Sequence, residues 1–438
     1  MQSGHLGSHM HDGTPVSSEH PKAQNRIHTL KFFSAISTSE TVPDILTDLK
    51  KQLSLSWRSK DTAGLACLFV SGDHRDNAHK LLEGIHQLVD IGTLIGCTGE
   101  SIIGSDKEVE QSHAVSLWLA KMPEVQVKAF ALGLAEISLA GDLNDWTSRI
   151  DTQPDEMPSF IVLPEPFTSD FKSTLEAMNE IYKGSVILGG VPSAGGRGEN
   201  LLFFNDQVRD EGIVGVALVG DIEVRAVVSQ GCRPIGRPFV VTNAQDNLIF
   251  ELAGEPALQR FQEVYSGLDE MDQTMVRKGL HVGRVVDEYK EDFQRGDFLI
   301  RNVIGADKES GGLAIADRVR VGQTIQFHVR DADSADEDLR ELLHQDIEDA
   351  EGASPLGALL FSCNGRGTRL FDRPGHDAGV ISEIMGNVPL AGFFAAGEIG
   401  PVADENFIHG FTASLAITKT AAEPHYDVLS RDVVLQLS

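Results

Sequence analysis

Three stretches of this sequence end an apolar run in glycines, and this recurrence is the feature that most constrains the fold. The most marked stretch, residues 390–401, reads LAGFFAAGEIGP and carries one carboxylate, Glu398, on its far edge. Residues 94–100, LIGCTGE, repeat the pattern, and residues 188–196, LGGVPSAGG, repeat it more weakly. Glycines at the end of a strand allow a sharp turn or a close approach to a ligand. The recurrence predicts one structural plan that is used three times.

The chain around each stretch follows the order strand, helix, strand. The predicted units cover residues 65–97, 160–189 and 356–394, each with a helical pattern between two short apolar runs. A crossover of this kind places its two strands parallel, whereas the later strands that return beside a unit are antiparallel. The sequence therefore predicts an α/β fold, with α+β character, in which mixed β-sheets are covered by helices.

The length of 438 residues favours more than one core. We expect two α/β regions, residues 25–237 and residues 238–425. Residues 1–24 are polar and include the cloning remnant GSHM, so we expect a disordered tail there. Residues 426–438 are predicted to form a C-terminal tail.

The charge of the chain excludes some classes of partner. Its 37 Lys and Arg residues face 65 Asp and Glu residues, which gives a formal net charge of −28. Such a chain is poorly suited to bind nucleic acid or anionic membranes, although a local basic pocket remains compatible with it. The four cysteines form no C-x-x-C pair, which favours reduced, buried thiols and gives no signal for a zinc site. With no apolar run of about 18 residues and no signal-peptide pattern, a cytoplasmic location is expected.

Several motifs in fixed order resemble the FIST family. They are IGCTGE at 95–100, SQGCRPIG at 229–236, FHVRDA at 327–332, FSCNGRG at 361–367, the stretch 390–401 and HGFT at 409–412. The resemblance covers residues 30–418 and implies a FIST N region followed by a FIST C region. It also implies a sensory role in intracellular signal transduction, in which a small ligand such as an amino acid or small carboxylate is bound. Output would then pass through an unidentified signalling protein.

The loop Cys363–Gly367 is the strongest candidate site because it follows a predicted parallel strand, where α/β proteins bind their ligands. Asn364 and Arg366 lie in this loop, and Arg366 is suited to grip a carboxylate. An amino acid also needs an anionic partner, so we pair Arg366 with Glu398. For each residue a structural alternative stays open, namely a tight turn with a surface arginine and a carboxylate that closes a turn.

Two further residues complete the predicted ligand site. Arg330 ends an alternating strand, and Glu100 follows the first glycine turn. Arg330 beside Asp331 is equally compatible with a surface ion pair.

Two other functions remain open, a protein–protein scaffold without a ligand and a cysteine-dependent hydrolase. For the hydrolase, Cys363 would act with His409 or His376 as base, but no local signature joins them. The sequence has no Walker motif, and its glycine-rich loop at 190–198 precedes a strand pattern instead of a helix. We therefore expect no cofactor and no metal, and the cysteine-dependent hydrolase stays as the alternative to a non-catalytic protein.

Overall fold

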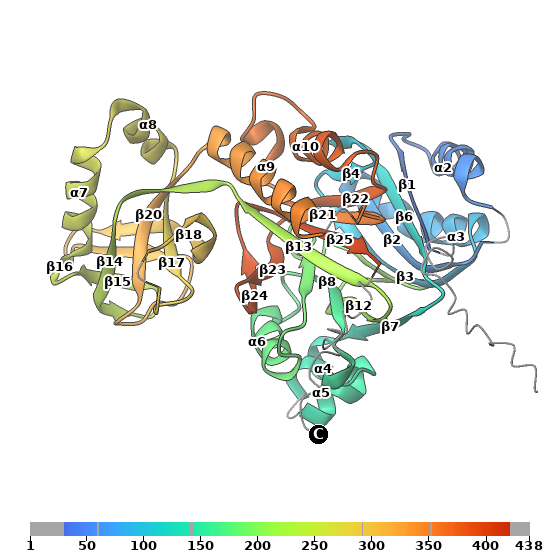
Figure 1. The fold of residues 1–438 in the computed structure, drawn as a ribbon, viewed down its shortest axis with the longest axis horizontal. Coiled ribbons are helices and arrows are strands. Elements are labelled where there is room, and N and C mark those ends of the chain that lie inside the picture. The colour runs from blue at the N-terminus through green and yellow to red at the C-terminus, as the bar shows by residue number, and fades with distance from the viewer. Residues whose placement is uncertain (1–29, 59–60, 140–142, 291, 351–352, 421–438) are drawn as a thin grey trace, which may run out of the picture.

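The computed structural model describes residues 30–58, 61–139, 143–290, 292–350 and 353–420. Figure 1 shows two lobes, a large body built from three β-sheets and a smaller lobe at the left that carries α7 and α8. None of the helices in the described ranges combines the length and apolar character needed to cross a membrane. The predicted α/β fold with mixed sheets is confirmed.

The first sheet of the body has six strands in the order β1-β6-β2-β3-β10-β11. They are β1 (Lys31–Ser37), β2 (Ala63–Ser71), β3 (Ile91–Gly99), β6 (Val115–Lys121), β10 (Leu202–Phe204) and β11 (Gln207–Arg209). Helix α3 (Ala78–Leu88) joins the parallel pair β2 and β3. Helix α2 (Val42–Ser56) begins at the capping hydroxyl of Thr41 and buries Ile45, Leu49 and Leu53, which recur on one face.

The second sheet has the order β24-β23-β9-β8-β12-β7. Its strands are β7 (Val125–Leu132), β8 (Ser159–Pro164), β9 (Ile187–Gly190), β12 (Ile213–Gly220), β23 (Glu398–Val402) and β24 (Glu405–His409). Helix α6 (Phe171–Ile181) joins the parallel pair β8 and β9. The short helices α4 (Leu134–Leu139) and α5 (Leu143–Ile150) follow β7.

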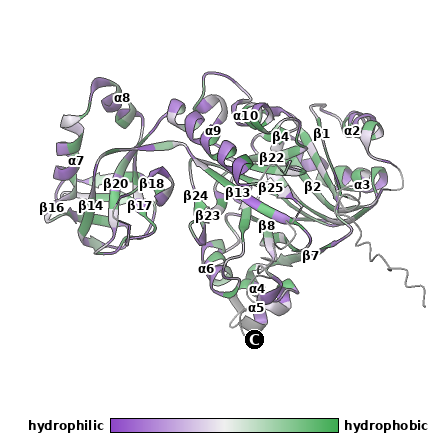
Figure 2. Cartoon of the chain, viewed as in Figure 1, coloured by the Kyte–Doolittle hydropathy of each residue, from purple (hydrophilic) through white to green (hydrophobic). Residues whose placement is uncertain are grey.

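The third sheet has the order β13-β25-β21-β22-β4-β5. Its strands are β4 (Ile102–Gly104), β5 (Lys107–Val109), β13 (Glu223–Gln230), β21 (Gly357–Cys363), β22 (Leu390–Ala395) and β25 (Thr412–Lys419). Helix α10 (His376–Met385) joins the parallel pair β21 and β22. Helix α9 (Ala332–Asp349) packs beside α10, and its solvent side is strongly hydrophilic (Figure 2).

The three glycine-ended strands occupy the same position in their sheets. Gly96, Gly189 and Gly392 lie opposite Leu68, Val162 and Leu360 of the preceding parallel strand. A Cβ on any of these glycines would come within 2.0 Å of the carbonyl oxygen opposite. These glycines therefore permit close contact between two strands, which is the structural basis of the recurrence in the sequence.

Each glycine-ended strand continues into a hairpin that joins a different sheet. The hairpin β4–β5 follows β3 of the first sheet but pairs with β22 of the third. The hairpin β23–β24 follows β22 but pairs with β9 of the second sheet, and β10–β11 follows β9 but pairs with β3 of the first. The exchange closes a ring of three sheets. Their inner faces share one apolar core that includes Phe69, Leu188 and Phe393.

The smaller lobe is a closed barrel. Its strand order is β14-β20-β17-β18-β19-β15-β16, and β15 also pairs with β14. The strands are β14 (Cys232–Gln245), β15 (Leu248–Leu252), β16 (Glu255–Pro256), β17 (Leu280–Val285), β18 (Phe298–Asp307), β19 (Gly312–Ile315) and β20 (Thr324–Arg330). Helices α7 (Ala257–Gly267) and α8 (Glu270–Lys278) lie outside the barrel (Figure 1).

Two adjacent strands connect the barrel to the body. Strand β14 enters from β13 through Gly231, and β20 leaves toward α9 through Asp331. Cys232 and Arg330 are paired at this point, and the Asp331 N–H donates to the Gly231 carbonyl at 3.4 Å. The covalent connection is therefore narrow, and side-chain contacts add to it: Gln230 Nε2 donates to the Phe298 carbonyl at 2.8 Å, and Arg295 pairs with Glu337 and Asp338 of α9.

The motif at residues 229–236 crosses from β13 into β14. A register shift between Ile235 and Phe239 accommodates Gly236 and Pro238 in this strand. The expected boundary at residues 237/238 falls inside the same strand. The two predicted tails, residues 1–24 and 426–438, lie outside the described residues.

Candidate functional site

A cleft of about 1850 Å³ separates the barrel from the body. Its body wall consists of α6 and residues 404–411, and its barrel wall includes Arg284, residues 300–302 and residues 316–320. Cys363, Ala396 and Phe411 also line it. In Figure 1, α6 and β24 lie on the side of the body that faces the barrel. The cleft thus reaches the loop that the sequence singled out.

The two walls of the cleft differ in charge. The barrel wall contains Arg284, Arg301, Arg318 and Arg320 against Asp246 and Asp317. The body wall contains Asp170, Glu176, Glu180, Asp404 and Glu405 against Lys172 and Lys183. Positive charge therefore predominates on one wall and negative charge on the other. A molecule with a carboxylate at one end and an ammonium group at the other would match both walls.

Arg366 is buried in the body, does not line the cleft and pairs with Asp377 instead of Glu398. Its side chain has no exposed surface, and its Nε and Nη2 donate to the two carboxylate oxygens of Asp377 at 2.7 and 2.8 Å. Arg366 also lies over the ring of Phe371, 5.3 Å from its centroid. The favourable charge of Arg366 keeps the pKa of Asp377 well below its usual range in spite of burial.

Glu398 is fully buried at the start of β23. Its Oε2 accepts the N–H of Thr412 at 3.1 Å and the hydroxyl at 2.8 Å. Burial raises the pKa of Glu398 to about 8, although the bonds from Thr412 lower it. The nearby Cys363 side chain also lowers this pKa. With a pKa of about 8, the carboxyl favours its protonated form near neutral pH and so offers a ligand ammonium less than a full counter-charge.

Cys363 lines the cleft, but its surroundings do not activate it. Burial raises the pKa of the thiol to about 12, and the nearby Glu398 raises it further. His409 Nε2 lies 2.9 Å from the Gly400 carbonyl, and His376 lies between Asp377 and Asp336. Among the hydrogen bonds of the described residues, none joins Cys363 to a histidine. The arrangement thus lacks the thiol–base contact that nucleophilic cysteines use.

The remaining predicted ligand residues surround the same loop. Arg330 Nη2 donates to the Gly365 carbonyl at 2.6 Å, and its guanidinium lies 5.1 Å from the centroid of Phe411. Because Arg330 ends a barrel strand, this bond joins the two lobes. Glu100 forms an exposed ion pair with Arg369, which also donates to the Asn364 carbonyl.

The structure brings all of the predicted ligand residues to one region, but only Cys363 and His409 of the predicted set line the cleft itself. Four buried polar atoms in this region have no hydrogen-bond partner among the described residues. They are Arg330 Nε, Asn364 Oδ1, Arg366 Nη1 and Glu398 Oε1. Buried polar atoms are normally satisfied, so unpaired ones mark places for a ligand or water. Throughout the described ranges, this region included, no group of three or more His, Cys, Asp or Glu residues is arranged to hold a metal ion.

Sequence reasoning missed the charged residues of the barrel wall. Arg284 and Arg301 belong to neighbouring strands, and Asp317 follows β19. A signal was present, because an arginine inside an apolar strand needs a partner or an opening to water. The pairing of these strands could not be derived from the local pattern, so the cluster was not visible.

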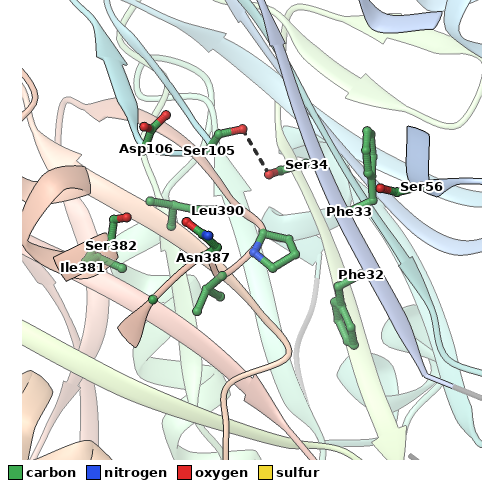
Figure 3. Close-up of a pocket in the computed structure, with 13 residues that line it drawn as sticks. Phe32, Phe33, Ser34, Ser56, Ser105, Asp106, Ile381, Ser382, Asn387 and Leu390 are labelled. Atoms are coloured by element: carbon green, nitrogen blue, oxygen red, sulfur yellow. Dashed lines mark hydrogen bonds between the residues drawn. The ribbon is translucent and has the colours of Figure 1, made fainter. Parts of the chain in front are cut away.

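A second cavity of about 400 Å³ lies between β1 and the end of α10. Figure 3 shows Phe32 and Phe33 on one side, Asn387 and Leu390 on the other, and the contact between Ser34 and Ser105. Asp106 is the one charged residue among those that line it, so this cavity offers no cation to a carboxylate.

Comparison with protein families identifies both halves of the chain. The FIST N domain model matches residues 64–255, and the FIST C domain model matches residues 257–401. The chain belongs to the FIST family. FIST domains are sensory domains in signal transduction. The junction of the two FIST models falls within the barrel, so the barrel and the third sheet each contain strands from both.

Relatives of this FIST protein include uncharacterized proteins of mycobacteria. An uncharacterized protein of Mycobacterium tuberculosis strain H37Rv is 42% identical over 357 residues, which are 81% of this chain and 91% of the relative. An uncharacterized protein of Mycobacterium bovis is 42% identical over 358 residues, which are 82% of this chain and 91% of the relative. A cyanuric acid hydrolase from A. caulinodans matches over 90% of this chain and 100% of its own at 8% identity and a TM-score of 0.32, too low to support an argument.

Proposed function

We propose that this protein is a sensor that binds an amino acid or a small carboxylate in the cleft between barrel and body and signals through a partner protein. The observation that carries the proposal is the cleft itself, about 1850 Å³ in volume and lined by both lobes. Ligand sites are typically concave and occur preferentially between domains.

The charges of the cleft support a zwitterionic ligand. A carboxylate would face the arginines of the barrel wall, and an ammonium group would face the carboxylates of α6 and β24. The originally predicted clamp of Arg366 and Glu398 is replaced in this proposal. Arg366 is engaged by Asp377, and Glu398 favours its protonated form near neutral pH.

The narrow connection supports a route from binding to signal. A ligand that contacts both walls would favour a closed arrangement of the lobes over an open one. Movement would occur about Gly231 and Asp331, next to the bond between Arg330 and Gly365. The surface that changes would be read by the partner, which supports signalling without a catalytic step.

The proposal is tested by a thermal-shift screen of the full chain with the amino acids and small carboxylates. A ligand present at about 100 times its Kd should stabilise the protein by about 2.7 kcal/mol. Gly410 lines the cleft, and a Cβ there meets no atom within 4 Å. Gly410→Phe should therefore obstruct the cleft and abolish the shift, whereas Gly410→Ala should retain it. A screen without any stabilising compound, or a shift that Gly410→Phe leaves intact, would count against the cleft.

A further inference from the structure

Asp317 on the barrel wall is shared by several cations. Its Oδ1 lies 2.9 Å from Lys172 Nζ, and its Oδ2 lies 3.0 Å from Arg301 Nε and 3.8 Å from Arg284 Nη2. Lys172 belongs to α6 of the body, so this bridge spans the cleft. Arg284 and Arg301 are diagonal neighbours on the same face of β17 and β18, since Arg284 lies opposite Leu299.

Nearby carboxylates do not balance this cluster. Burial lowers the pKa of the Arg284 guanidinium and the cations Arg301 and Arg320 lower it further, whereas Asp317 and Glu288 raise it. Four cations, Lys172, Arg284, Arg301 and Arg320, therefore face these two carboxylates. Arg284 Nε is buried and has no hydrogen-bond partner among the described residues. Side chains of Arg284, Arg301 and Lys172 all line the cleft. Surplus positive charge with an unused donor is the arrangement that binds an oxyanion.

The acidic character of the whole chain makes this surplus of positive charge unusual. The chain as a whole carries a formal charge of −28, and cations in such a chain would normally be neutralised by nearby carboxylates. Here the side chain of Asp317 is only 8% exposed, whereas that of Lys172 is 59% exposed and free to turn toward a ligand. Lys172 can therefore exchange Asp317 for another anion without leaving a buried charge unpaired.

We propose that Arg284, Arg301 and Lys172 form an oxyanion subsite on the barrel side of the cleft, which takes the carboxylate or phosphate group of a small molecule beside Asp317. This inference rests on the proposed function and adds the residues that select the ligand. A bound oxyanion contacts both lobes, because Arg284 and Arg301 belong to the barrel and Lys172 to the body. The subsite therefore couples recognition of the ligand to the relative position of the lobes.

Isothermal titration calorimetry of the full chain with succinate and, separately, with inorganic phosphate tests the subsite. Chloride is added to hold the ionic strength constant. We expect saturable binding of at least one probe, and the stronger of the two identifies the group that the subsite prefers. Arg284→Gln should weaken that binding about tenfold or more, which is the effect of losing a charge-assisted hydrogen bond. Lys172→Gln, at an exposed position, should weaken it several-fold.

The matched control is Lys183→Gln. It removes one positive charge from the same cleft but leaves Asp317 and its cations untouched. This control should change binding by less than about threefold, since only the long-range field is altered. The melting temperature of each variant without anions reports whether it folds, and Lys172→Gln remains informative if Arg284→Gln does not fold.

Absence of saturable binding by both probes would overturn the subsite, and so would equal affinities of the Arg284, Lys172 and Lys183 variants. These outcomes are distinct from failure of the proposed function. If a compound from the thermal-shift screen binds the Arg284→Gln variant as tightly as the native protein, the subsite proposal is wrong, but the proposed ligand site in the cleft is still supported.

Discussion

Glu398 shows how burial changes the chemistry that a residue offers. Burial raises its pKa to about 8 from an ordinary value of 4.5. Between these pH values the folded protein keeps a proton that the unfolded chain releases. The contribution of Glu398 to the free energy of unfolding is therefore largest at low pH and is lost as the pH rises to about 8, by at most about 1.4 kcal/mol per pH unit.

Glu398→Gln should flatten this pH dependence, because Gln does not ionise and still offers an oxygen to Thr412. Urea denaturation between pH 5 and 9 measures the effect. A smaller loss of stability with rising pH is expected in the variant. A residual slope is expected from Glu108, whose pKa burial also raises to about 8. Identical slopes in both proteins would contradict the assignment to Glu398.

Arg366 and Arg369 each pair with a carboxylate, but the Arg366 pair is buried and the Arg369 pair is exposed to solvent. Arg366→Ala leaves the buried Asp377 without its guanidinium partner, although Ser362 and His376 still contact it, so a loss of about 3–5 kcal/mol is expected. Arg369→Ala removes a solvent-exposed pair with Glu100 and should cost less than about 1 kcal/mol. Chemical denaturation of both variants measures the difference. Equal losses would show that the Arg366 pair does not hold the core of the body together.

Cys363 should behave as an unreactive thiol. Because burial raises its pKa to about 12, the thiolate that attacks alkylating agents is scarce near neutral pH. Iodoacetamide labelling followed by mass spectrometry should show slow modification of Cys363 at pH 7. Faster labelling than that of a free cysteine peptide would revive the hydrolase alternative.

At the scale of the element, the glycine-ended strands were the part of the fold that local sequence could reveal. Gly96, Gly189 and Gly392 mark equivalent positions because no other residue allows that approach between strands. The exchange of hairpins between sheets was not predictable, because the apolar pattern of a strand does not indicate which other strand it pairs with. Arg366 illustrates the same limit at the site, since its pairing with Asp377 depends on how α10 packs.

Gly392→Ala tests the role of these glycines. A Cβ at this position would lie 1.8 Å from the Leu360 carbonyl oxygen, so β21 and β22 must separate. We expect a loss of about 3 kcal/mol, as for severe overpacking. Gly379→Ala in α10 is the control, because its Cβ meets no atom within 4 Å and should stabilise the helix by up to about 1 kcal/mol. A stable Gly392→Ala protein would argue against the close approach.

At the scale of the whole molecule, the body is a ring of three interlocked sheets and the barrel is attached to it by two strands. The ring is held by exchanged hairpins and a shared core, so in the proposed sensor movement is expected between the barrel and the body. Sensing by this protein is therefore expected to take the form of closure of the barrel on the body.

Closure of the barrel on the body can be followed by pulsed EPR, which measures the distance between two spin labels. Val321 is exposed on the barrel beside the cleft, and Lys183 is exposed on the body wall. Spin labels at Val321→Cys and Lys183→Cys should report a shorter and narrower distance distribution after a ligand from the screen is added. An unchanged distribution with bound ligand would mean that the signal does not arise from lobe movement.

A crystal structure of the full chain with the best compound from the screen will show whether the ligand binds between the lobes. We expect ligand density in the cleft, with a carboxylate against Arg284 and Arg301 and the other end toward the body wall. Ligand density elsewhere, such as in the cavity beside Phe32 and Asn387 (Figure 3), with an empty cleft would contradict binding between the lobes.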